Sequence, residues 1–162
     1  MSGIIGGAVT RTKDEMNITE IITMDHRKVD TLFMEIEKTD DSQKLQEFFG
    51  QLYKDLSVHA EAEEQIVYPA IRSYYGDTQE LYDEQAEMKQ MLSQIKGLNP
   101  SNSNFKEQIK QLKTAVQDHV RQEENDMFPQ IRRNLSEAQM EQMATQFKAA
   151  KNTIQQEMAG MS

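Results

Sequence analysis

The chain has 162 residues, of which 37% are hydrophobic, and a formal net charge of −9. This length is typical of one domain with a core of its own. Cysteine is absent, which excludes disulfides, thiolate metal sites and cysteine nucleophiles. The acidic balance, with no basic cluster to neutralise phosphates, predicts no nucleic-acid partner.

The chain begins with the apolar stretch MSGIIGGAV. It is far shorter than a membrane span and lacks the basic start of a secretory signal. We interpret residues 1–16 as a flexible N-terminal arm in front of a domain at residues 17–162. No segment is long and apolar enough to cross a bilayer, so we expect no membrane partner and a cytoplasmic location.

Five helices are predicted from start and stop motifs. Capping boxes at Asn17–Glu20 and Ser136–Gln139 open the first and the fifth. The acidic cluster at residues 40–42 opens the second, and the loop at residues 99–103 separates the third from the fourth. The expected helices run from 18 to 38, from the 40–42 cluster to about 75, from 78 to about 97, from the 99–103 loop to about 134, and from about 136 to 158.

Apolar residues recur at helical spacing in the first four helices, as at Ile109, Leu112 and Val116 in the fourth. No segment shows sustained alternation of apolar and polar residues. Long helices joined by short loops predict an all-α fold, an antiparallel up-down-up-down four-helix bundle with an additional C-terminal helix.

A sequence motif occurs twice in the chain, as HAEAEEQIVYPAIR at residues 59–72 and as HVRQEENDMFPQIR at residues 119–132. Each copy places a glutamate four residues after its histidine, as His59 with Glu63 and His119 with Glu123. On a helix these positions lie one turn apart on one face. An imidazole nitrogen and a carboxylate oxygen there are suitable ligands for iron, manganese or zinc.

The two histidines are predicted to lie inside the bundle. Burying Glu63 and Glu123 beside them would be costly without a cation. The adjacent Glu64 and Glu124 lie about 100° round each helix, and we expect them to be solvated. Apolar residues stand seven and three positions before each histidine, namely Leu52, Leu56, Leu112 and Val116.

The remaining histidine, His26, belongs to the first helix. Apolar residues follow His26 at spacings that the third helix repeats after Gln85. Gln85 therefore stands at the position of the third helix that matches His26. All three histidines therefore occupy matching inward positions of one four-helix plan, and the fourth position is a glutamine.

With these motifs the chain resembles the hemerythrin-like, or HHE cation-binding, domains over about residues 17–134. The resemblance rests on His26, on the two His-x-x-x-Glu pairs and on the aromatic-proline dipeptides Tyr68-Pro69 and Phe128-Pro129. It implies a non-heme, carboxylate-bridged di-iron centre within the bundle. It also implies that the protein binds or senses dioxygen or a related small oxidant, such as peroxide or nitric oxide.

The resemblance also implies a role for each ligand. His26 and His59 would be terminal ligands of one iron, His119 would serve the other, and Glu63 and Glu123 would bridge. Family members usually carry a histidine where this chain has Gln85, so we expect a weaker or more open second site. Gln85, Glu84, Tyr82 or water would have to complete it, and manganese or zinc remains possible.

Two other functions stay open. The first is an iron-dependent enzyme acting on peroxide, nitric oxide or a small organic substrate at an open iron site. The second is a metal-free structural bundle in which the histidines pair with buried glutamates. A ferritin-like centre is disfavoured, because no histidine has a glutamate three residues before it. We further expect Tyr68 and Phe128 to pack in the core, and Pro69 and Pro129 to kink or end their helices.

Overall fold

The computed structural model describes residues 16–160, and within them every regular element is helical, which confirms the all-α class. The predicted arm, apart from Met16, lies outside the described residues. No helix in this range has the length and apolar character needed to cross a membrane. The elements are α1 Ile18–Lys38, α2 Ser42–Ala62, η2 Glu63–Val67, α3 Tyr68–Ile71, α4 Thr78–Lys96, α5 Ser103–Gln122, η3 Glu123–Met127, α6 Phe128–Asn134 and α7 Glu137–Gly160.

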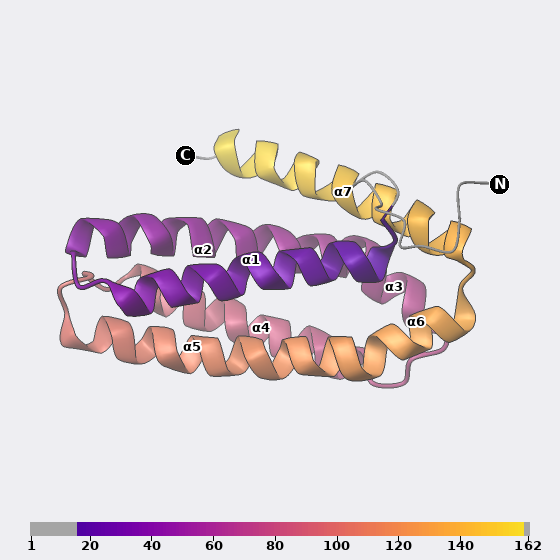
Figure 1. The fold of residues 1–162 in the computed structure, drawn as a ribbon, viewed down its shortest axis with the longest axis horizontal. Helices are drawn as coiled ribbons and strands as arrows, with labels where there is room; N and C mark the ends of the chain where they lie inside the picture. Colours follow the sequence, from indigo (N-terminus) through magenta and orange to yellow (C-terminus); the bar gives the residue numbers. More distant parts are fainter. Residues whose placement is uncertain (1–15, 161–162) are drawn as a thin grey trace, which may run out of the picture.

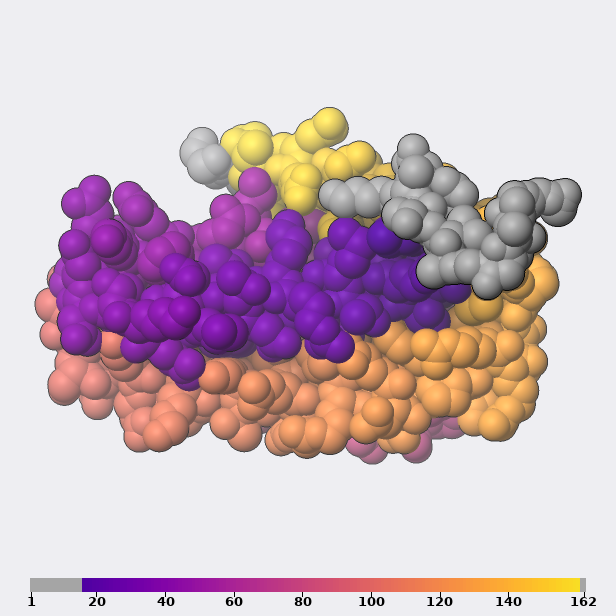
Figure 2. All heavy atoms as spheres, in the orientation of Figure 1, coloured from indigo at the N-terminus to yellow at the C-terminus, as the bar shows by residue number. Residues whose placement is uncertain are grey.

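Four long helices, α1, α2, α4 and α5, lie side by side along the longest axis of the molecule (Figure 1). The helix α1 packs against α2, and α4 packs against α5. The C-terminal helix α7 lies along the outer side of α1 and α2 and contacts both. On the face in Figure 2, α1 and α5 lie next to each other, and α7 rises above α1 at one edge.

Both predicted capping boxes are confirmed. The Asn17 side chain accepts from the Glu20 amide at 3.2 Å, and the Glu20 carboxylate accepts from the Asn17 amide at 2.9 Å. The Ser136 hydroxyl and the Gln139 side chain make the equivalent pair at 3.1 and 2.8 Å. These bonds satisfy amides that a helix start leaves free, and each cap contributes about 1 kcal/mol.

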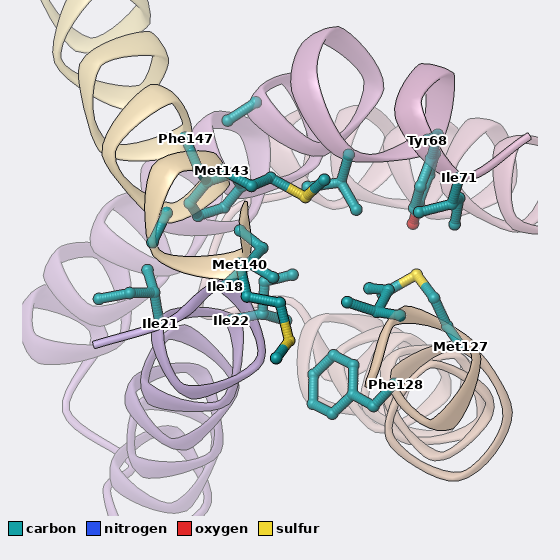
Figure 3. Close-up of a cluster of buried hydrophobic side chains, with 14 of the residues drawn as sticks. Ile18, Ile21, Ile22, Tyr68, Ile71, Met127, Phe128, Met140, Met143 and Phe147 are labelled. Carbon is teal, nitrogen blue, oxygen red and sulfur yellow. The ribbon is translucent and has the colours of Figure 1, made fainter. Parts of the chain in front are cut away.

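The buried apolar side chains form two clusters along the bundle. The first joins the start of α1 to α3, α6 and α7, and Figure 3 shows part of it, including Ile18, Ile71, Phe128 and Phe147. The second fills the other end, with Phe33, Leu52, Leu92 and Leu112 among its members. Complete burial of one phenylalanine, such as Phe147, contributes about 1.5–3 kcal/mol, so apolar packing helps to hold α7 in place.

Polar residues separate the two clusters. On α1, His26 lies between Ile22 of the first cluster and Val29 of the second. On α4, Gln85 lies in the same way between Leu81 and Met88. The fold therefore holds a buried polar layer near the middle of an otherwise apolar interior.

The second and fourth predicted helices are each interrupted by a wider, π-helical turn, which the sequence did not predict. The Tyr68 amide donates to the carbonyl of Glu63, and the Phe128 amide donates to that of Glu123, five residues back in both cases. The prolines that follow have no amide hydrogen, and their rings would clash with a carbonyl four residues back in a regular α-helix. The π turn accommodates each proline, and a short helix continues beyond it.

Candidate metal centre

The polar layer contains all six residues that the sequence nominated. His26, His59, Gln85 and His119 come from α1, α2, α4 and α5, and the two glutamates begin the π turns. All six are buried, and Glu63 and Glu123 have no exposed surface at all. Buried carboxylates at this depth require partners that stabilise their charge.

Four of the six converge on one point. His26, His59, Glu63 and Glu123 each offer a ligand atom, and these atoms all lie within 4.8 Å of one another. His26 Nε2 is 3.1 Å from Glu123 Oε1, and His59 Nε2 is 3.3 Å from Glu63 Oε1. Ligands about 2.1 Å from a shared ion lie about 3 Å apart at right angles and about 4.2 Å apart when opposite. The two measured pairs therefore have the separation of neighbouring ligands on one divalent ion.

His119 lies at the other oxygen of Glu123. Its Nε2 atom is 3.2 Å from Glu123 Oε2, whereas Oε1 of the same carboxylate faces His26. One carboxylate thus contacts histidines from two helices through different oxygens. This is the position a carboxylate needs in order to bridge two ions.

Tyr68 is a site residue that sequence reasoning missed. Its ring is fully buried in the core, as expected, but its hydroxyl lies among the ligands: 2.5 Å from Glu123 Oε2, 3.1 Å from His119 Nε2 and 3.2 Å from Glu63 Oε1. The π turn places position i+5 on the same face as position i, which brings Tyr68 beneath Glu63. Only the proline after Tyr68 hinted at that turn.

Gln85 approaches the site through its amide nitrogen. Nε2 donates to the Tyr68 hydroxyl at 2.5 Å and to Glu63 Oε1 at 3.2 Å. The tyrosine that faces the site is Tyr68, whereas Tyr82 packs edge-on against the Tyr68 ring with centroids 5.1 Å apart. Gln85 therefore orients Tyr68 and Glu63 in this structure.

Each histidine also contacts a further carboxylate through its second ring nitrogen, Nδ1. The Nδ1 atoms of His26, His59 and His119 lie 2.7 Å from oxygens of Glu124, Asp25 and Glu84, respectively. Such pairs fix the ring, and here they leave Nε2 facing the candidate centre. The expectation that Glu124 is solvated is therefore wrong, because the His26 ring turns toward it.

Glu64 also departs from expectation. It lies 3.1 Å from the Lys89 ammonium on α4, and its side chain is 22% exposed. The expectation of a solvated carboxylate holds only in part, because α4 brings the Lys89 ammonium within ion-pair distance.

The pKa values of the two glutamates reflect their burial and the charged groups beside them. Burial, and then the charge of Glu123, raise the pKa of Glu63 to about 7. Burial would also raise the pKa of Glu123, but the charges and hydrogen bonds of His119 and His26 outweigh it and hold that pKa well below its ordinary value. Two carboxylates this close need protons or a cation between them.

Several buried atoms in the layer have no hydrogen-bond partner among the described residues. They are His59 Nε2, Glu63 Oε2 and Gln85 Oε1. Leaving buried polar atoms unsatisfied is costly, and imidazole nitrogen with carboxylate and carbonyl oxygen is a set of metal donors. The residues present therefore fit a metal ion.

A cavity of about 30 Å³ adjoins these ligands. His59, Glu63, Gln85 and His119 line it on the polar side, and its other walls include Val29, Leu56, Leu92 and Val116. This cavity has room for at least a water-sized molecule beside the candidate ligands.

Comparison with known proteins agrees with this geometry. The hemerythrin HHE cation-binding domain family matches residues 17–131. A protein of Nostoc sp. named DNA nickase is 56% identical over 165 residues, which cover 99% of this chain but only 47% of that relative. This chain thus spans about half the length of that relative.

An uncharacterized hemerythrin-like protein of Schizosaccharomyces pombe is 28% identical over 142 residues, which cover 85% of this chain and 70% of that protein. No solved structure gives a significant match. The family match covers most of the chain and includes all six nominated residues, so the chain belongs to the hemerythrin HHE cation-binding domain family.

Proposed function

We propose that this protein holds a pair of non-heme iron ions and binds or senses dioxygen or a related small oxidant. The observation that carries the proposal is the convergence of His26, His59, Glu63 and Glu123 within 4.8 Å in a buried layer. When bound, such iron supplies reversible redox and Lewis-acid chemistry toward small oxidants. Manganese or zinc would suit the same donors.

The ligands divide into two sets around the shared glutamates. His26 and His59 would hold one ion, with Glu63 and Glu123. His119 and the other oxygen of Glu123 would hold the second. Tyr68 is the best-placed additional ligand there, because its oxygen is 3.1 Å from His119 Nε2, about the separation of neighbouring ligands on one ion.

We infer an antiparallel up-down-up-down bundle made of α1, α2, α4 and α5, with α7 appended, as one domain over residues 17–162. Figure 1 is consistent with this arrangement, because short connections join consecutive long helices at alternate ends of the molecule. The predicted cytoplasmic location stays a prediction.

The small cavity favours a small ligand. It has room for dioxygen, peroxide or nitric oxide beside His59, Glu63 and His119. An enzyme acting on peroxide or nitric oxide is therefore the nearest alternative. Steady-state consumption of either by the iron-loaded protein would favour the enzyme, whereas reversible dioxygen binding without consumption would favour a carrier or sensor.

A DNA-directed activity is a second candidate, because a 56% identical relative is named DNA nickase. The net charge of −9 gives little electrostatic attraction to phosphates. A supercoiled-plasmid nicking assay with the metal-loaded protein tests this candidate, with metal-free protein as the control. We expect no nicking by this chain alone.

The first test is the number of ions per chain. After anaerobic loading with ferrous iron and removal of the excess, we expect elemental analysis to give two irons per chain. One iron would mean that the His119 side is not a stable site. A value near zero would contradict the proposal and favour a metal-free bundle with buried polar pairs.

The substitution Gln85→His should strengthen the second site. It supplies a nitrogen ligand where the family usually has one, so we expect roughly tenfold tighter binding of the second iron, the scale of single-partner effects at metal sites. A competition titration with a chromophoric chelator measures it. Unchanged second-site affinity would mean that Tyr68 already fills the position.

A further inference from the structure

The helix α7 lies outside the residues that the family matches, since it begins at Glu137 and the match ends at residue 131. It nevertheless reaches the candidate centre. The Phe147 ring on α7 meets the His59 ring edge-on, with centroids 5.6 Å apart. The Lys151 ammonium lies 5.5 Å from the centre of the Phe147 ring, one helical turn further along.

Lys151 also binds the carboxylate that holds His59. Its Nζ atom lies 2.8 Å from Asp25 Oδ1 and 2.7 Å from Asp25 Oδ2. Asp25 Oδ2 lies in turn 2.7 Å from His59 Nδ1. A continuous chain of contacts therefore runs from α7 through Asp25 to a nominated metal ligand.

We propose that Lys151 is a positioning residue for the metal centre, and that through Asp25 and His59 it links the docking of α7 to metal occupancy. This inference rests on the proposed metal binding. Lys151 fixes both oxygens of Asp25, so the His59 ring is held at one angle with Nε2 toward the site. Without Lys151 the Asp25 carboxylate loses the partner that fixes both of its oxygens, and its hold on the His59 ring weakens.

The carboxylate that holds His26 is fixed less firmly than the one that holds His59. Glu124, which holds His26, meets Arg27 at 3.4 Å, and the Arg27 side chain is 58% exposed. The Lys151 and Asp25 side chains are 21% and 13% exposed, and their contact is shorter. Less solvent and shorter distances strengthen a charge pair, so the His59 side is the more firmly held.

The linkage must act in both directions. If docked α7 increases the affinity for metal, bound metal stabilises the docking of α7 by the same factor. Metal binding would then make α7 dock more stably on the outer side of α1 and α2, where it lies. A partner that displaced α7 would, by the same argument, weaken metal binding.

The test compares three variants with the wild type. Lys151→Met keeps an apolar stem over Phe147 and removes the charge. Lys151→Arg keeps the charge and can hold both oxygens of Asp25. Lys113→Met is the matched control, since Lys113 is 25% exposed and pairs with Glu37 at 2.7 Å, and neither Lys113 nor Glu37 is among the residues lining the cavity.

Ferrous iron affinity is measured anaerobically by chelator competition, and the metal-free melting temperature shows that each variant folds. We expect Lys151→Met to bind iron about tenfold more weakly, with Lys151→Arg and Lys113→Met within about twofold of wild type. In the wild type, iron loading should also slow amide hydrogen exchange in α7, a measurement that needs no variant.

Lys151→Met binding iron as tightly as Lys113→Met would overturn the inference and leave the proposed metal site intact. Unchanged exchange in α7 on loading of the wild type would do the same. Failure of the wild type to take up iron would contradict the metal site itself, and the inference with it.

Discussion

The substitution Glu123→Gln is expected to abolish metal binding. Glu123 offers Oε1 to His26 and Oε2 to His119, at 3.1 and 3.2 Å. A glutamine keeps the shape but loses the charge, and its amide nitrogen turns a donor toward one of these histidines. We expect iron affinity to fall by more than a hundredfold, beyond the 10–100-fold typical of residues that only support a ligand.

Elemental analysis after anaerobic loading measures the loss, and a shift in melting temperature on adding iron reports binding independently. The control is Glu107→Gln, which removes an exposed carboxylate from the same helix, α5, and should bind iron as the wild type does. Full iron occupancy in Glu123→Gln would mean that this carboxylate bridges nothing and that the assigned ligands are wrong.

The substitution Tyr68→Phe is expected to remove the second ion and leave the first. It keeps the fully buried ring and deletes the oxygen that lies near His119, Glu123 and Glu63. The substitution removes none of the donor groups of the first set, which are those of His26, His59 and the two glutamates. We expect the iron content to fall from two per chain to about one.

The same variant has a spectroscopic readout. Ferric iron bound to a phenolate absorbs visible light, so the oxidised wild type should show a visible band that Tyr68→Phe lacks. The control is Tyr82→Phe, which removes a hydroxyl from the ring that packs edge-on against Tyr68. Two irons and an unchanged band in Tyr68→Phe would show that Tyr68 is only a hydrogen-bond donor in the layer.

Much of this protein could be predicted from local patterns. A capping box such as Asn17 with Glu20 involves residues three apart, so the helix starts were found correctly. A histidine and a glutamate four apart share one helix face wherever the helix lies. The apolar spacing before His59 and His119 placed them inside, and both are buried.

Other features were decided by a local geometry that residue types do not specify. The π turns at Glu63 and Glu123 shift the helix register by one residue, which brings the Tyr68 hydroxyl into the buried polar layer. A pattern counted at 3.6 residues per turn cannot show this shift. Sequence reasoning therefore named Tyr82 as a possible ligand and assigned Tyr68 to packing alone.

Helical periodicity and side-chain chemistry are enough to predict which residues face inward and which of them could donate to a metal. The contacts that hold those side chains follow from the packing of the helices. Glu124 meets His26 from 98 positions away, and Lys151 meets Asp25 from 126 positions away. Contacts at such separations depend on how the helices pack, and no short-range pattern in the sequence encodes that packing.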